Sequence, residues 1–237
     1  MIRAIRYVLA TVWYTVWYCT RILLGVAAGI RDTPGDFYDR LQRGYGRAMM
    51  RATGIDLVVE GADQLLVGEP VVFVSNHLSW IDIWALLVAL PGTVRFVFKK
   101  ELSRVPFLGA ALHAMGHIEI DRTNRTSAFA VYDRAAAQVR KGASAIVFAE
   151  GTRSRDGRLL PFKKGPFVLA IAAQVPVVPV CCVGTYDLLP SGSIAPKPGR
   201  VVVRIGRPIA TAGFGYDARE AVSDRARRAM LALGSVE

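Results

Sequence analysis

The sequence has few of the residues that build disulfide frameworks or metal centres. Its 237 residues include three cysteines and three histidines. Cys19 stands alone and Cys181 and Cys182 are adjacent, so the cysteines have the spacing of neither a disulfide framework nor a zinc site. His113 and His117 have no matching ligand cluster beside them. We therefore expect reduced thiols facing a cytoplasm, no metal ion and no cofactor.

Acidic residues are scarce relative to basic ones. The chain has 19 Asp and Glu against 30 Lys and Arg, which gives a formal net charge of +11. This charge favours an anionic partner, and nucleic acid, an anionic membrane or a phosphorylated or acidic-carrier substrate all fit it. No recognition-helix, aromatic-platform or basic-tail pattern accompanies the charge, which argues against nucleic acid. A hydrophobic content of 52% favours the membrane.

Residues 2 to 30 predict one long amphipathic helix, because apolar residues recur every three or four positions. Arg3, Arg6 and Arg21 fall on one stripe of this helix, and Trp17 lies close to them. Basic and aromatic residues placed in this way favour a helix that lies in the membrane interface. The apolar positions are Ile5, Leu9, Val12, Val16, Cys19, Leu23, Val26 and Ile30.

Two other interpretations of this segment stay open. Tyr7 to Ile30 contains one charge, Arg21, so it also fits a transmembrane helix. A signal peptide fits less well, because the apolar region is rich in aromatics and no small-residue cleavage site follows it. Residues 32–36 then break the helix, and 36–53 predict a second, more polar one. Our preferred prediction is a helical hairpin, residues 1–53, resting on one leaflet.

From Gly54 the pattern changes to short β-branched runs that alternate with helical segments. This alternation predicts an α/β domain over residues 54–237, with a mostly parallel sheet covered by helices. The run Val175 to Val180 contains two prolines, so we expect it to wall a pocket rather than continue a central ladder. The predicted strands are 55–60, 71–75, 94–98, 117–120, 144–149, 175–181 and 201–205. The predicted helices are 80–89, 105–115, 125–141, 165–173 and 217–233.

The stretch Ser75 to Asp82 joins one predicted strand to a helix. Ser79 occupies an N-cap position and Asp82 follows three residues later, as in a capping box. Side chains in the first helical turn lean toward the N-terminus, so the Asp82 carboxylate is expected to reach back toward His77. An imidazole held by a carboxylate has a fixed tautomer and can act as a general base. The alternative is that Asp82 only caps the helix and His77 is an ordinary loop residue.

Further charged and small residues follow other predicted strands, at the edge where ligands gather in open parallel sheets. Lys99 and Lys100 could hold an anion or stabilise an oxyanion, or form a solvated turn. Arg122 suits a phosphate, or pairs with its neighbour Asp121. The run Glu150-Gly151-Thr152-Arg153 could cradle a glycerol hydroxyl and its phosphate, or be a polar loop.

Taken together, these motifs resemble the four ordered motifs of the glycerolipid acyltransferase family, and most closely its bacterial 1-acyl-sn-glycerol-3-phosphate acyltransferases. The resemblance covers about residues 55 to 210, and the order and spacing of the motifs carry it. The five segments that match them are Asn76-His77-x4-Asp82, Lys99-Lys100-Glu101-Leu102 with Pro106 and Gly109, Ile120-Asp121-Arg122, Phe148 to Ser154, and Val175 to Pro179.

The resemblance implies direct transfer of a fatty acyl group from acyl-CoA or acyl carrier protein to the sn-2 hydroxyl of lysophosphatidate. His77 would be the base, Asp82 would orient it, and Lys99 would offset charge on the thioester oxygen. Arg122 and Arg153 would hold the phosphate, while Glu150, Gly151 and Thr152 would place the glycerol. The sequence has no Gly-x-Ser-x-Gly elbow, which fits a mechanism without an acyl-enzyme.

The same resemblance places the enzyme on the cytoplasmic face of the inner membrane, where anionic lipid would be a partner of the basic surface. Two alternatives stay open at this point. One is the same chemistry on glycerol 3-phosphate or another lysolipid. The other is a basic membrane-surface binding protein without catalytic activity, whose polar strand ends are only solvated loops.

Overall fold

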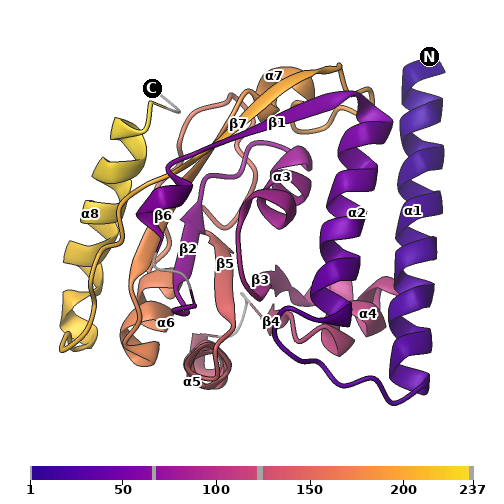
Figure 1. Ribbon diagram of the computed structural model, residues 1–237. Coiled ribbons are helices and arrows are strands. Elements are labelled where there is room, and N and C mark those ends of the chain that lie inside the picture. The colour runs from indigo at the N-terminus through magenta and orange to yellow at the C-terminus, as the bar shows by residue number, and fades with distance from the viewer. Residues whose placement is uncertain (1, 66–67, 122–124, 235–237) are drawn as a thin grey trace.

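A seven-stranded sheet separates two helical layers in the computed structural model (Figure 1). The structure describes residues 2–65, 68–121 and 125–234, but not the side chains of 125–130. The strand order is β1-β7-β6-β2-β5-β3-β4. Strands β2 to β6 run parallel to one another, while β7 runs antiparallel to β6. The strands are β1 (Ile55–Glu60), β2 (Val72–Ser75), β3 (Val94–Lys99), β4 (Ile118–Ile120), β5 (Ser144–Phe148), β6 (Val177–Val183) and β7 (Gly199–Ile205).

Each predicted strand and helix is present, with ends within three residues of the prediction. The predicted α/β class is therefore confirmed. The long helices are α1 (Ile2–Ala27), α2 (Phe37–Thr53), α3 (Ile81–Ala89), α5 (Arg125–Arg140), α6 (Gly165–Ala173) and α8 (Arg219–Ala232). The short ones are α4 (Leu108–Ala114), α7 (Thr185–Leu188), η1 (Ala62–Gln64), η2 (Lys100–Arg104) and η3 (Tyr216–Ala218).

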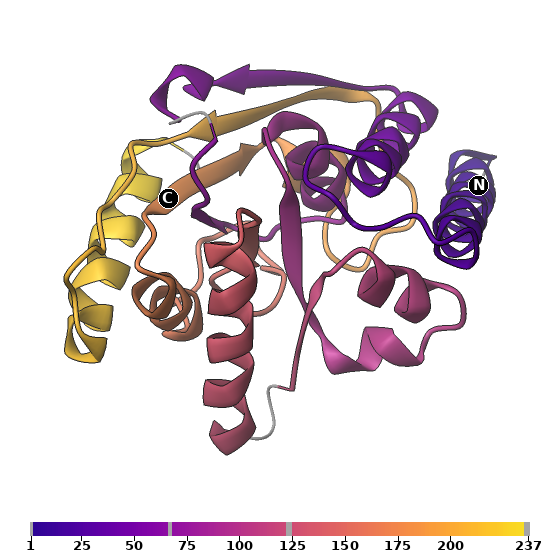
Figure 2. The same ribbon diagram turned by 60° about the horizontal axis from the view of Figure 1, so that its bottom comes forward.

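Helices α5, α6 and α8 cover one face of the sheet, and α3 and α2 cover the other, with α1 outermost (Figures 1 and 2). The α2 residues Met49 and Met50 lie in the same core as the β2 residue Phe73 and the α3 residue Trp84. The N-terminal hairpin therefore shares its core with the sheet, which fixes it relative to the strand ends.

Helix α1 buries only a narrow stripe and leaves most of its apolar side chains in contact with solvent. Tyr7, Cys19, Ile22 and Gly25 are buried. In the part of the chain that the structure describes, no helix combines the length and the apolar character needed to cross a membrane. The exposed apolar residues are Ile2, Ile5, Val8, Leu9, Val12, Trp13, Val16, Trp17, Leu24 and Val26.

The expectation for the proline-containing run was wrong, because β6 lies in the middle of the sheet between β7 and β2. Pro179 is tolerated there because it lies just outside the ladder between β6 and β7, which ends at the Val180–Ile205 pair. The Pro179 carbonyl oxygen accepts a 2.8 Å hydrogen bond from the Gly206 amide, one residue past the end of β7. The N–H and C=O of one strand residue point to the same side, so the missing N–H faces this interrupted stretch.

Candidate functional site

His77 and Asp82 form a hydrogen-bonded pair at the carboxyl edge of the sheet. The two side chains come from the loop after β2 and the first turn of α3. His77 Nδ1 lies 2.9 Å from Asp82 Oδ2, and the Asp82 side chain is fully buried. The imidazole ring also stacks on Phe148, the last residue of β5, with ring centroids 3.7 Å apart. Because Nδ1 is held by the carboxylate, Nε2 is the nitrogen that remains to take a proton.

Hydrogen bonds like those of the predicted capping box hold this pair in place, although α3 begins one residue later than predicted and Trp80, not Ser79, is its N-cap. Asp82 Oδ2 accepts hydrogen bonds from the amides of Leu78 and Ser79, at 2.7 and 2.8 Å. Ser79 Oγ accepts from the Ile81 amide and donates to the Leu189 carbonyl. One carboxylate oxygen thus starts α3 and orients His77 at the same time. The other oxygen, Oδ1, is buried and has no hydrogen-bond partner among the residues described.

Glu150 joins the His77 loop to the loop that follows β5. Its carboxylate accepts hydrogen bonds from the amides of His77, at 2.7 Å, and Leu160, at 2.8 Å. The Ser154 amide returns a 2.8 Å bond to the His77 carbonyl. Only 2% of Glu150 is exposed, and burial raises the pKa of its carboxyl to about 7, although the two amides oppose this shift. The Glu150 carboxylate thus holds the backbone at His77, because each of its oxygens accepts a hydrogen bond from a backbone amide.

Asn76 attaches the same loop to β6. Its side-chain amide makes two hydrogen bonds with the Cys182 backbone, donating to the carbonyl at 3.0 Å and accepting from the amide at 2.8 Å. Asn76 is fully buried. His77 is therefore fixed by contacts to β5, β6 and α3, which gives the imidazole a preorganised position.

Arg153 lies over the face of Trp80, with its guanidinium carbon 4.6 Å from the ring centroid. Trp80 is 40% exposed and stands directly before α3, so the pair lies at the surface beside the His77 loop. Tyr7 of α1 packs against Trp84 of α3, with ring centroids 6.1 Å apart. Burial raises the pKa of the Tyr7 hydroxyl, and the Arg153 charge lowers it to a smaller extent. The first half of α1 therefore borders this site.

The other predicted residues are less closely joined to the pair. Gly151 has a φ of 75°, which glycine adopts without strain, and Thr152 is exposed. Lys99 ends β3, two strands from β2, and is exposed. Strand alternation turns Lys99 away from the face on which Phe98 and Phe148 lie, and among the described residues nothing links it to His77 or Asp82. Arg122 lies outside the described residues.

Trp80 and Phe148 are site residues that our reasoning from the sequence did not assign. Both lie within the quoted motifs, Trp80 two residues before Asp82 and Phe148 two residues before Glu150. Phe148 also stacks on Phe96, with centroids 5.8 Å apart, so the imidazole rests on an aromatic layer. Their proximity to His77 and Arg153 in the motifs was the available signal, but an aromatic residue at a strand end is equally typical of a core.

The remaining histidines do not form a metal centre. His117 is buried, its Nδ1 accepts a 2.8 Å hydrogen bond from the Phe96 amide, and burial lowers its pKa to about 3. His113 Nε2 pairs with Glu119 at 3.1 Å on the surface. Within residues 2–65, 68–121 and 125–234, no group of three or more His, Cys, Asp or Glu is arranged to hold a metal ion.

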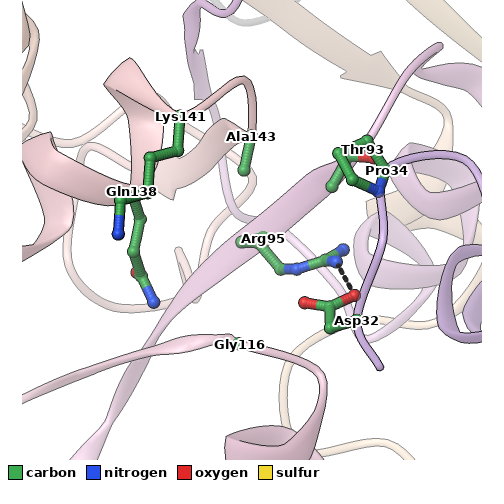
Figure 3. Close-up of a pocket in the computed structure, with 8 residues that line it drawn as sticks. All are labelled: Asp32, Pro34, Thr93, Arg95, Gly116, Gln138, Lys141 and Ala143. Atoms are coloured by element: carbon green, nitrogen blue, oxygen red, sulfur yellow. Dashed lines mark hydrogen bonds and ion pairs between the residues drawn. The ribbon is translucent and has the colours of Figure 1, made fainter. Parts of the chain in front are cut away.

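A cavity of about 190 Å³ lies at the opposite edge of the sheet, beside the start of β3 (Figure 3). Its main polar feature is Arg95, which pairs with Asp32 at 2.7 Å and with Asp39 at 2.6 Å. Gln138 of α5 and Lys141, one residue past its end, line the other side. This arrangement ties the hairpin to the sheet and is separate from the His77 site.

Comparison with known proteins agrees with this geometry. The family model described as Acyltransferase matches residues 56–183, which include β2, α3 and the loop after β5. The chain belongs to the acyltransferase family. The family match thus covers His77, Asp82, Lys99, Glu150 and Arg153.

Similar proteins include a 1-acyl-sn-glycerol-3-phosphate acyltransferase from Limnanthes douglasii, 34% identical over 85% of this chain and 70% of that protein. A protein of the same name from Cocos nucifera is 32% identical over 83% of this chain and 62% of that protein. The chain spans 39% to 64% of the length of the first three curated relatives that it matches.

Among solved structures, the chain is similar to the 1-acyl-sn-glycerophosphate (LPA) acyltransferase PlsC from Thermotoga maritima. The TM-score is 0.76 and the sequences are 27% identical. The match covers 100% of this chain and 96% of that one, so it includes the N-terminal hairpin as well as the sheet.

Proposed function

We propose that this acyltransferase moves a fatty acyl group from an acyl thioester to the sn-2 hydroxyl of 1-acyl-sn-glycerol-3-phosphate, giving phosphatidate. The observation that carries the proposal is the 2.9 Å contact between His77 Nδ1 and the fully buried Asp82 carboxylate, on a loop that also presents Trp80, the partner of Arg153. The names of the similar proteins support the choice of acceptor. No cofactor takes part in the proposed reaction.

In the proposed reaction His77 Nε2 removes the proton of the acceptor hydroxyl while the hydroxyl oxygen attacks the thioester carbonyl carbon. The new C–O bond produces a tetrahedral oxyanion. This intermediate collapses as the C–S bond breaks, and the leaving thiolate takes the proton back from the imidazolium. Asp82 keeps the imidazole in the tautomer that accepts at Nε2 and stabilises the imidazolium.

The positive and small residues at the carboxyl edge of the sheet have the following proposed roles. Arg153 and Arg122 bind the acceptor phosphate, and Gly151 and Thr152 contact the glycerol. Lys99 offsets negative charge on the thioester oxygen, which requires its exposed side chain to turn toward the donor. Glu150 acts as a positioning residue, because both of its oxygens bond to backbone amides.

We further propose that the hairpin rests in one leaflet on the cytoplasmic face of the inner membrane. Exposed apolar residues of α1, with Arg3, Arg6 and Arg21 exposed among them, support this location. Lysophosphatidate could then meet His77 without leaving the leaflet. The donor would be acyl-CoA or acyl carrier protein, whose phosphates or acidic surface suit a chain with a net charge of +11.

The test is an acyl-transfer assay with labelled thioester and lysophosphatidate, run on wild type and on His77→Ala. Removing a catalytic base of this kind costs about 10²- to 10⁴-fold in rate, so the variant should be folded but nearly inactive. Wild-type turnover together with an unchanged rate in His77→Ala would refute the role of the base. Circular dichroism of both proteins controls for unfolding.

An acceptor panel separates the related alternatives. Glycerol 3-phosphate and a lyso-aminolipid are compared with lysophosphatidate, each with acyl-CoA and with acyl carrier protein as donor. Arg153 favours a phosphate-bearing acceptor, so lysophosphatidate should give the highest kcat/KM. If no lysolipid consumes the thioester, the chain acts as a basic binding protein on the membrane surface.

A further inference from the structure

Phe107 stands at a strained point of the backbone between η2 and α4. Its φ is 62° and its ψ is −46°. The Leu108 amide donates to the Pro106 carbonyl at 2.7 Å, which closes a three-residue γ-turn around Phe107. This turn, with its positive φ at the central residue, is rare and strained, and glycine would adopt it with less cost than phenylalanine.

The strained turn displays apolar residues to solvent instead of burying them. Phe107 is 61% exposed and Val105 is 42% exposed, with Pro106 exposed between them. We call Val105, Pro106 and Phe107 the apolar tip. Consecutive exposed apolar residues cost solubility, and their presence in folded proteins usually marks a contact surface.

Several contacts at its base hold the apolar tip out from the fold. Ser103 Oγ donates to Glu119, and the Gly109 amide bonds to the Val105 carbonyl at 3.0 Å. A Cβ atom at Gly109 would lie 2.1 Å from the Ser103 carbonyl oxygen, so only glycine lets the chain return this closely. The tip is therefore presented by a tightly packed support.

The position and charge of the apolar tip suggest what covers it. It follows β3 at the carboxyl edge of the sheet, the edge that holds His77. Helix α4, which begins after the tip, packs on α1, and the two helices lie on the same side of the molecule (Figures 1 and 2). Arg104 directly precedes the tip and is exposed, as is Lys99. Apolar and basic side chains together fit an anionic membrane surface.

We propose that the apolar tip is a second membrane contact, which inserts Phe107 and Val105 into an anionic bilayer at the sheet edge that holds His77. The α1 surface and the tip then attach the enzyme at two separate points, which limits how far the His77 edge of the sheet can tilt away from the leaflet. This inference rests on the membrane association in the proposed function, but it does not depend on the identity of the acceptor.

A fluorescent label measures insertion at chosen positions. The native thiols do not compete for the label, because Cys19, Cys181 and Cys182 are buried. Burial also raises the pKa of Cys19 to about 11 and that of Cys182 well above its ordinary value. An environment-sensitive maleimide therefore reacts with an introduced, exposed cysteine in the folded protein.

Three cysteine variants of the full chain report on three surfaces. Phe107→Cys tests the apolar tip, Val12→Cys tests α1, and Leu231→Cys on α8 is the control, since Leu231 is exposed to the same extent as Val105, 42%. The probe is a vesicle of equal parts phosphatidylcholine and phosphatidylglycerol. We expect a blue shift and quenching by bilayer-embedded doxyl lipid at Phe107→Cys and Val12→Cys, and neither change at Leu231→Cys.

The outcomes separate this inference from the membrane association itself. A response at Val12→Cys without one at Phe107→Cys overturns the second contact and leaves the α1 contact in place. No response at either position overturns both. A shift of the Phe107→Cys label on adding acyl carrier protein, with none on adding vesicles, would assign the tip to a protein partner and also overturn the proposal.

Phe107→Gly supplies an independent test that a folding defect cannot imitate. Glycine relaxes the positive φ, so the melting temperature should stay the same or rise. Vesicle partitioning should nevertheless weaken by about threefold or more, because the aromatic side chain is lost. A large fall in melting temperature with unchanged partitioning would show that Phe107 is kept for folding, and would overturn the proposal.

Discussion

Glu150 shows how one buried carboxyl group serves the His77 loop at a cost that depends on pH. Burial raises its pKa from 4.5 to about 7, against the effect of two backbone amides. Between these two values the folded protein keeps a proton that the unfolded chain releases. The free energy of unfolding therefore contains a favourable contribution below pH 4.5 that is lost as the pH rises toward 7.

Glu150→Gln removes this titration. As the pH rises, the free energy of unfolding of wild type should therefore fall relative to that of the variant. The full change is on the order of 3 kcal/mol, at about 1.4 kcal/mol per pKa unit. Urea unfolding of both proteins from pH 4.5 to pH 8 measures it. Glu220→Gln, which alters an exposed carboxylate, is the control. A difference that stays constant over this range would contradict the raised pKa.

Trp80 is the residue from which we expect an effect on acceptor binding alone. Its ring supports the Arg153 guanidinium at 4.6 Å, and such contacts contribute about 0.5–2 kcal/mol. Trp80→Leu should raise the KM for lysophosphatidate by roughly threefold to tenfold, with kcat and the thioester KM unchanged. Trp80→Phe should restore much of the loss. Equal effects on both substrates would instead indicate a general disturbance of the loop.

The part of the site that is local in sequence could be predicted from the sequence. His77, Ser79 and Asp82 lie within one turn of a helix start, so capping rules determine how their side chains meet. The contacts of Glu150 with His77 and of Arg153 with Trp80 join residues about seventy positions apart. No local rule gives those contacts, so the sequence alone did not predict that Glu150 binds the backbone amides of His77 and Leu160.

At the scale of elements, Arg95 joins the hairpin to the sheet. The β3 guanidinium pairs with Asp32, which precedes α2 (Figure 3). It also pairs with Asp39 inside α2, and the Asp39 side chain is fully buried. Gln42 and the Gly35 amide also bond to the Asp39 carboxylate. Removing one partner of a buried ion pair leaves the other charge without compensation, which costs about 3–5 kcal/mol.

Arg95→Met should therefore lower the free energy of unfolding by about 3–5 kcal/mol. Combining it with Asp39→Asn should cost less than the sum of the single changes, because the two residues share one interaction. Arg40→Met is the control, because Arg40 lies on α2, the helix that carries Asp39. Arg40 pairs with Asp36 on the surface, and such pairs contribute at most about 1 kcal/mol. Equal costs for Arg95→Met and Arg40→Met would show that the buried network contributes little. Urea unfolding gives all four values.

Elements were predictable wherever their own sequence sets their pattern. The periodicity of α1 and the β-branched runs of the strands gave their ends within three residues. The position of β6 in the sheet was not predictable, because two prolines indicate an edge unless the neighbouring strand ends beside them. That neighbour, β7, begins 16 residues past the end of β6. The order of strands in a sheet depends on such distant partners.

At the scale of the whole molecule, the apolar and basic residues of α1 form one exposed surface. Leu9 is 64% exposed, as is Trp13, and neither supports the core. Apolar side chains in this position gain little from folding, so replacing them should leave stability almost unchanged. Their effect should instead appear in membrane binding, where the transfer of each side chain from water contributes.

Leu9→Asp and Trp13→Asp should each reduce partitioning into anionic vesicles by about tenfold while the melting temperature stays within a few degrees of wild type. Raising the salt concentration should weaken wild-type binding as well, because screening reduces the attraction between a chain of charge +11 and the lipid phosphates. Co-sedimentation with vesicles measures both effects, and Leu231→Asp on α8 is the control. If Leu231→Asp reduces binding as much as Leu9→Asp, the attraction depends on net charge alone. In that case α1 has no special role in orienting His77 toward the leaflet.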